Sequence, residues 1–149
     1  MLDWFNDGAI IVVDLALACC AVESEFAVPE GAPLVEGIPD QARVVVVVSG
    51  TLTDAVAGLA QSTVQQLVDQ VGPDRVQVIS FGACASAGGP YWDSYSVTKG
   101  VDQLVLVAHY IAGCPPPPSA LANHLDTLHA NELPAKGLPA DQLTGGPVA

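Results

Sequence analysis

Four cysteines are the residues of this sequence with the clearest chemical potential. Cys19 and Cys20 form a tandem pair, Cys84 lies in a glycine-rich stretch, and Cys114 precedes a run of prolines. Thiolates are soft, anionic ligands, and four of them match the ligand count of a cubane iron–sulfur cluster. In a reducing compartment, metal binding or catalysis is a more common use of cysteine than a structural disulfide. We therefore expect the four side chains to meet at one metal centre.

Three other uses of these cysteines have to be weighed. A structural zinc ion also takes four thiolates, but its ligands usually arrive as closely spaced Cys-x₂₋₄-Cys pairs, and here they do not. Four unconnected core cysteines would each be a small buried hydrophobe, which leaves the glycines, prolines or second cysteine beside each one unexplained. A catalytic cysteine needs a nearby histidine, and the sequence offers His109, His124 and His129. Two of these histidines fall in an expected helix, which makes the third use weak.

The elements that would position the cysteines can be read from hydrophobic patterning. Arg43–Ser49 contains five consecutive valines, a pattern typical of a strand covered on both faces in a parallel sheet. Thr53 can cap a helix from Asp54 to about Val71, which Gly72 and Pro73 would end. The segment Ala9–Glu25 begins with β-branched residues and predicts a short strand or extended piece.

The second half of the chain repeats the strand and helix alternation. Strands are predicted at Arg75–Phe81 and Leu104–Ala108, and Ser119 is expected to cap a last helix that runs to about His129. The fold class is therefore α/β, a small doubly wound, mainly parallel, flavodoxin-like sheet with helices on both faces. Such sheets bind ligands outside the carboxyl ends of their strands, which is where Cys84 and Cys114 fall.

Composition bounds the domain organisation and the partners. Residues 1–130 are expected to form one domain and residues 131–149 a disordered tail, since the tail has no periodicity. Four basic residues oppose sixteen acidic ones, and the net charge of -12 argues against nucleic acid and anionic lipid as partners. Half of the residues are hydrophobic, so part of the surface is expected to face a partner protein.

Targeting and nucleotide-binding signals are not visible. The acidic start of the chain is unlike a secretory signal, which favours the cytosol, and the apolar run Ala9–Cys20 is short of the roughly 20 residues of a membrane helix. No P-loop, haem motif or Gly-x-Gly-x-x-Gly follows a strand, so the chain itself is not expected to bind NADH or flavin.

The cysteine motifs and their neighbours resemble one family. The residues that carry the resemblance are Leu17–Glu23 (Leu-Ala-Cys-Cys-Ala-Val-Glu), Val48–Thr53 (Val-Ser-Gly-Thr-Leu-Thr), Gly82–Gly89, Tyr95–Val97, Gly100–Asp102 and Tyr110–Pro116. Together they look like the B-type, or 20 kDa, subunit of the NADH:quinone oxidoreductase known as complex I. The small subunits of energy-converting NiFe hydrogenases are related, but their first ligands are usually spaced Cys-x-x-Cys, so the tandem pair favours the complex I side.

The resemblance implies a cofactor and a place in a larger enzyme. It implies one 4Fe–4S cluster held by Cys19, Cys20, Cys84 and Cys114, in an electron-transfer subunit that passes electrons to quinone and is not active alone. Its partners would be a larger catalytic subunit, neighbouring iron–sulfur subunits and quinone at the interface. The protein would be peripheral, on the cytoplasmic side of the cell membrane, without a transmembrane segment. Glu23 matches a family carboxylate, and either proton-coupled tuning of the cluster or a plain salt bridge or solvated acid is open for it.

The chain also departs from the family pattern. The segment between the cysteine pair and the valine strand is shortened, and Ile38–Arg43 stands where the family pattern is Ser-Pro-Arg-Gln-Ala-Asp. Pro117 stands where arginine is common. These departures leave the cysteines intact but indicate a divergent member. The small subunit of a hydrogenase or a formate hydrogenlyase-like complex, and a non-redox structural subunit, are therefore the alternatives.

Overall fold

The computed structural model describes residues 1–131, and its centre is the valine strand that the sequence indicates. β3 spans Arg43–Ser49, and each residue of the run Val44–Val48 is 0% exposed. Alternate valines face opposite sides of the sheet, so that one set packs on each of two hydrophobic clusters. The uninterrupted apolar run is thus explained by burial on both faces.

Within residues 1–131, five strands form the sheet, in the order β1-β2-β3-β4-β5. The bounds of the other strands are β1 Leu2–Asp3, β2 Ile10–Ala16, β4 Val76–Phe81 and β5 His109–Ile111. β2, β3, β4 and β5 run parallel to one another, and β1 pairs antiparallel with β2. The four parallel strands therefore end at the same edge.

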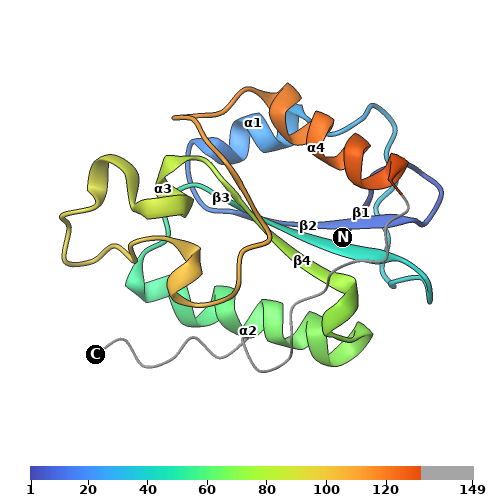
Figure 1. The fold of residues 1–149 in the computed structure, drawn as a ribbon, viewed down its shortest axis with the longest axis horizontal. Helices are drawn as coiled ribbons and strands as arrows, with labels where there is room; N and C mark the ends of the chain where they lie inside the picture. Colours follow the sequence, from blue (N-terminus) through green and yellow to red (C-terminus); the bar gives the residue numbers. More distant parts are fainter. Residues whose placement is uncertain (132–149) are drawn as a thin grey trace.

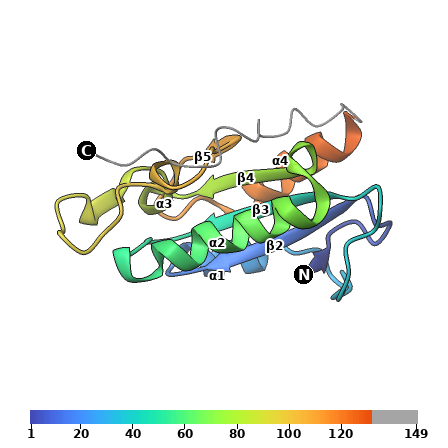
Figure 2. The same cartoon turned by 90° about the horizontal axis from the view of Figure 1, so that it is seen from below.

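Helices cover both faces of this sheet (Figure 1). α2 (Asp54–Val71) packs on one face, as Figure 2 shows, and α1 (Cys20–Phe26) and α4 (Pro118–Ala130) pack on the other. The remaining helical turns are α3 (Ala83–Ala87), η1 (Pro73–Arg75), η2 (Gly89–Tyr91) and η3 (Val101–Gln103). The predicted α/β class, mainly parallel and covered on both faces, is confirmed.

The strand order has one feature that the sequence did not indicate. In the flavodoxin order 2-1-3-4-5, a parallel strand lies outside the first one. Here the short antiparallel β1 lies outside β2, and residues 27–42, which connect α1 to β3, contribute only an isolated bridge from Leu34 to Leu2. The edge of the sheet beside β2 is therefore only partly covered.

The prediction of a strand at Leu104–Ala108 is wrong, because these residues form turns and irregular backbone. Pairing with β4 begins only at Ala108, whose N–H donates to the carbonyl of Val78, and β5 follows at His109. Residues such as Val105, which is 4% exposed, pack over the α2 face of the sheet instead of lying in it. An apolar run that covers a sheet has the same composition as one within it.

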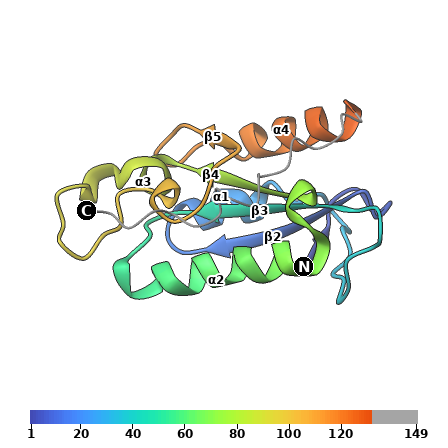
Figure 3. The same cartoon turned by 60° about the horizontal axis from the view of Figure 1, so that its bottom comes forward.

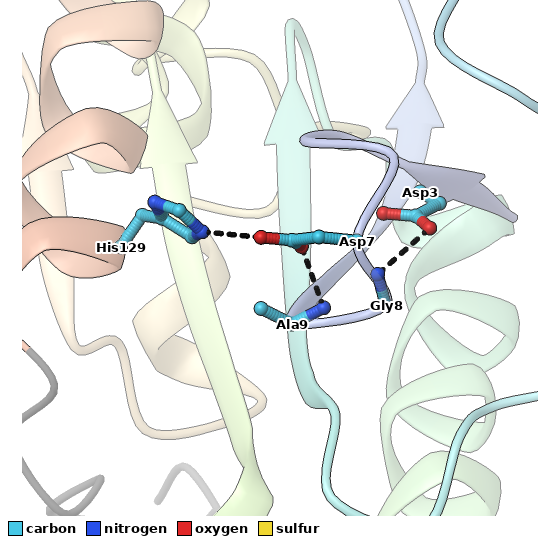
Figure 4. Close-up of polar contacts among 5 residues, drawn as sticks. All are labelled: Asp3, Asp7, Gly8, Ala9 and His129. Carbon is cyan, nitrogen blue, oxygen red and sulfur yellow. Dashed lines mark hydrogen bonds and ion pairs between the residues drawn. The ribbon is translucent and has the colours of Figure 1, made fainter.

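The two ends of the domain also differ in detail from expectation. α4 begins at Pro118 with Pro117 at its N-cap, so Ser119 lies in the first turn and is not the cap. Near the end of α4, the Nε2 atom of His129 lies 2.7 Å from Oδ2 of Asp7, whose Oδ1 accepts the N–H of Ala9 (Figure 4). This contact ties α4 to the loop before β2. The disordered tail predicted for residues 131–149 lies outside the described residues, apart from Asn131.

None of the helices within residues 1–131 combines the length and the apolar character needed to cross a membrane.

Candidate metal centre

The cysteines follow the ends of three parallel strands. Cys19 comes three residues after β2, Cys84 three residues after β4, and Cys114 three residues after β5. Because parallel strands end at one edge, all three loops open on the same side of the sheet, the end at which α3 lies in Figure 3.

Main-chain hydrogen bonds join these loops to one another. The N–H of Gly82 donates to the carbonyl of Ile111 at 2.9 Å, and the N–H of Ala83 donates to that of Gly113 at 2.8 Å. On the other side, the N–H of Leu17 donates to the carbonyl of Ser49 at 2.9 Å. The loops that carry the cysteines are therefore held by the backbone at the ends of β2, β3, β4 and β5.

Two glycines make room for the two inner thiols. Gly82 has a φ of +99°, and a Cβ there would stand 2.5 Å from Sγ of Cys20. Gly89 has a φ of +55°, and a Cβ there would stand 2.8 Å from Sγ of Cys84. No side chain heavier than hydrogen fits at either position without moving a sulfur atom. The glycine-rich stretch after β4 thus shapes the space around both thiols.

The four thiols divide into an inner and an outer pair. Cys20 and Cys84 are 1% and 2% exposed, whereas Cys19 and Cys114 are exposed, and all four are free thiols. Burial raises the pKa of Cys20 to about 12, and the nearby charges of Cys19, Cys84 and Cys114 add to this effect. Cys20 is therefore close enough to the other three cysteines for each of their charges to act on it.

The thiols do not surround a single point. Within residues 1–131, no group of three or more His, Cys, Asp or Glu side chains is arranged so that it could hold one metal ion. In a cubane cluster the four thiolates bind to different iron atoms, so they need not lie within bonding distance of a common centre. A tetrahedral zinc ion requires all four sulfur atoms within about 2.3 Å of one position.

The histidines lie in contacts of their own. His109 on β5 stacks on His124 of α4, with ring centroids 3.9 Å apart. Burial, and then the charge of His109, lower the pKa of His124 to about 4. His129 contacts Asp7 before β2, at the opposite edge from the cysteines. A thiol activated by a histidine therefore has no support among these contacts.

Two carboxylates beside α1 complete the surroundings. Oε2 of Glu23, in the first turn of α1, is buried and has no hydrogen-bond partner among residues 1–131. Asp14 on β2 accepts hydrogen bonds from Ser24 Oγ at 2.6 Å and from Ser49 Oγ at 2.8 Å. Burial raises the pKa of Asp14, although the two serine hydroxyls act in the opposite direction. In the sequence, Asp14 is visible as an interruption of an apolar run, but nothing there indicates either of its partners.

Comparison with known proteins gives a consistent match. A family model described as "NADH ubiquinone oxidoreductase, 20 Kd subunit" matches residues 12–128. An NADH-quinone oxidoreductase B-type subunit of Salinispora tropica is 41% identical over 176 residues, which cover 99% of this chain and 90% of the relative. A second B-type subunit, from Streptomyces griseus subsp. griseus, is 41% identical over 158 residues. That alignment covers 99% of this chain but 64% of the relative, so the chain spans just under two thirds of its length.

A solved structure has a similar fold. A chain of the membrane-bound sulfane sulfur reductase, an archaeal respiratory membrane complex, superposes with a TM-score of 0.59 at 22% identity. The match covers 86% of this chain and 72% of that one, and at this identity it establishes likeness of fold alone.

Proposed function

Because the chain belongs to the family of the 20 kDa subunit of NADH ubiquinone oxidoreductase, we propose that it carries one 4Fe–4S cluster and delivers electrons to quinone. The chain is a subunit of a quinone oxidoreductase complex. The proposed ligands are Cys19, Cys20, Cys84 and Cys114. The proposed partners are a larger catalytic subunit and neighbouring iron–sulfur subunits, with the quinone at the interface. The proposed location is peripheral, on the cytoplasmic side of the cell membrane.

One observation carries the cluster proposal: two glycines leave space where the inner thiols stand. A Cβ at Gly82 or at Gly89 would collide with Sγ of Cys20 or of Cys84. Both glycines have positive φ, which an alanine adopts only at a cost. A side chain at either position would displace a sulfur atom, so both glycines are needed for the two inner thiols to keep the positions from which they would bind one group.

The charges of the thiols support the same conclusion. Burial is the main cause of the raised pKa of Cys20, and the charges of the other three thiols raise it further, so four thiolates on one edge would repel one another. Iron offsets that repulsion, because ligation stabilises the deprotonated sulfur.

The protein's own residues would hold, shield and present the group. Cys20 and Cys84 lie on the inside, where the buried ends of β3 and β4 exclude water. When bound, a 4Fe–4S cluster supplies one-electron transfer. Cys19 and Cys114 are exposed, so the side they occupy is the one that a partner protein must cover. A groove of about 440 Å³ adjoins that side, with Trp92 and Tyr110 among its lining residues. Its apolar walls suit a quinone ring or a partner side chain.

The test is the metal content of the full chain purified without oxygen. We expect about four irons and four acid-labile sulfides per chain and an electron paramagnetic resonance signal on reduction. Cys84→Ser should lose most of the iron and change or abolish the signal, whereas Ser119→Ala on the exposed start of α4 should retain both. A chain without iron, or a Cys84→Ser variant with the full signal, would refute the proposal.

A further inference from the structure

The second half of β2 has an outer edge with which no other strand of the described structure pairs. The N–H of Leu17 and the carbonyl of Ala9 bond to β3. The main-chain N–H and C=O groups of the odd-numbered residues of β2 therefore point to β3. The main-chain groups of the even-numbered residues point away from β3. In the described residues β1 covers these groups at Val12, which pairs with Leu2, and the carbonyl of Ile10 accepts the N–H of Trp4. The main-chain groups of Asp14 and Ala16 therefore point to the open side of the sheet, where both residues are exposed. Figure 2 shows β2 on the side of the sheet opposite to β5.

A groove runs beside this open edge. Its volume is about 830 Å³, and it lies between the strand and α1. Most of its lining residues are apolar, among them Val13, Ala16, Ala21 and Val22. Val22 and Leu34, both on the rim, are 51% and 83% exposed. Such an apolar surface next to unpaired main-chain groups is suited to receive an extended segment of polypeptide.

The charge of the groove defines what can enter it. Asp14 and Glu25 line it, and none of the described residues that line it has a basic side chain. The Asp14 carboxylate is fixed by the hydroxyls of Ser24 and Ser49, both of which are buried. Both of these hydrogen-bond partners are neutral, and the nearby charge of Glu25 is negative. A lysine or arginine from outside would supply a compensating positive charge.

We propose that the open edge of β2 binds an extended, basic segment of a partner polypeptide, which pairs with the main chain of Asp14 and Ala16 and places a lysine or arginine at the Asp14 carboxylate. A second copy of this chain fits poorly, because pairing β2 with itself brings two Asp14 carboxylates together between molecules that each carry a net charge of -12. None of the four cysteines lines this groove beside β2. The proposal therefore holds or fails independently of the cluster.

Amide hydrogen exchange tests the main-chain part. The full chain is compared in isolation and in the complex that is purified from membranes through a tag on this chain. We expect the amides of Asp14 and Ala16 to exchange at least about tenfold more slowly in the complex, while the exchange of Val45, inside the sheet, is slow in both. Equal exchange of Asp14 and Ala16 in the two samples would overturn the proposal.

Variants test the geometry and the charge. Ala16→Pro removes an outward N–H without removing a bond to β3, and Ala16→Val retains that N–H as the matched control. We expect the amount of partner protein that co-purifies to be at least about tenfold lower for the proline variant than for the wild type. The valine variant should co-purify as much partner protein as the wild type. Asp14→Lys should lose as much partner protein as the proline variant, and Asp14→Asn less, because the amide still bonds to the serines.

Each other outcome has a defined meaning. If Ala16→Pro does not fold, the proposal is decided by two other results. These are the amide exchange of the wild type, and whether Asp14→Lys co-purifies less partner protein than Asp14→Asn. Full co-purification of Asp14→Lys would overturn the charge argument. A wild-type chain that forms a homodimer through β2, detected by light scattering and abolished by Ala16→Pro, would overturn the choice of partner.

Discussion

Replacement of Gly82 by alanine tests the argument about space around Cys20 most directly. The new Cβ would stand 2.5 Å from Sγ of Cys20 and 3.5 Å from Cδ of Pro116, and the backbone would have to keep a φ of +99°. Backbone strain of this kind costs about 1 to 3 kcal/mol. The overpacking that pushes the sulfur aside costs about 1 to 3 kcal/mol more. The expected loss of about 2 to 6 kcal/mol is a large part of the stability of an ordinary domain, about 5 to 15 kcal/mol.

The chain offers a matched control for this variant. Gly72 ends α2 with a φ of +92°, and a Cβ there would meet nothing within 4 Å. Gly72→Ala therefore carries the backbone strain without the collision, so the difference between the two variants isolates the displacement of Cys20. The assays are urea unfolding, for the free energy, and the iron content per chain after anaerobic purification.

The two variants should separate in both assays. We expect Gly82→Ala to be less stable than Gly72→Ala and to bind less than half as much iron, because Cys20 can no longer keep its position. Gly72→Ala should bind as much iron as the wild type. Equal stability of the two variants would refute the packing argument, and full iron binding by a well-folded Gly82→Ala would refute the role of this space in holding a cluster.

Three further expectations follow from contacts at the same edge and beside it. Cys114→Ser should lower the iron content to below half, with little effect on the free energy of unfolding because the side chain is exposed; full iron content would contradict its proposed role. Ser49→Ala removes a buried donor to Asp14 and should cost about 1 to 3 kcal/mol in urea unfolding near pH 7. The loss should shrink toward pH 4, because protonation of Asp14 removes the charge that the Ser49 hydroxyl stabilises, and a loss independent of pH would contradict this account. His124 has a pKa lowered to about 4, so the unfolded chain binds more protons between about pH 6.5 and 4. The full shift would lower the stability by about 2 kcal/mol from pH 7 to pH 5, and because the ring is only partly buried we expect a fall of about 1 kcal/mol. His124→Gln should reduce that slope, and an unchanged slope would show that His124 is not responsible for it.

The elements that burial alone determines could be predicted from the sequence. β3 has the expected bounds because five valines in a row indicate a strand that is buried on both faces. α2 has the expected bounds because a glycine followed by a proline, here Gly72 and Pro73, ends a helix. The separation of the cysteines by strands was enough to place them on one edge. These features depend on local chemistry or on a general property of parallel sheets.

The features that could not be predicted depend on contacts between distant residues. Leu104–Ala108 has the composition of a strand, and only its packing over the face of the sheet shows that it is not one. Asp14 bonds to residues 10 and 35 positions away, and no local pattern pairs a carboxylate with such serines. β1 has two residues, too few for any periodicity. The partly covered edge of β2 follows from that short strand and was therefore also missed.

The valine strand has a consequence for any experiment that opens the protein. Val44–Val48 has high β-propensity, no charge and no proline, and its full burial between β2 and β4 is all that shields it from other molecules. Once heat separates the sheet, identical segments from different molecules can stack on one another faster than they refold. Thermal scans should therefore be irreversible and depend on scan rate and concentration, so lifetime at a given temperature describes the robustness of this chain better than a melting point.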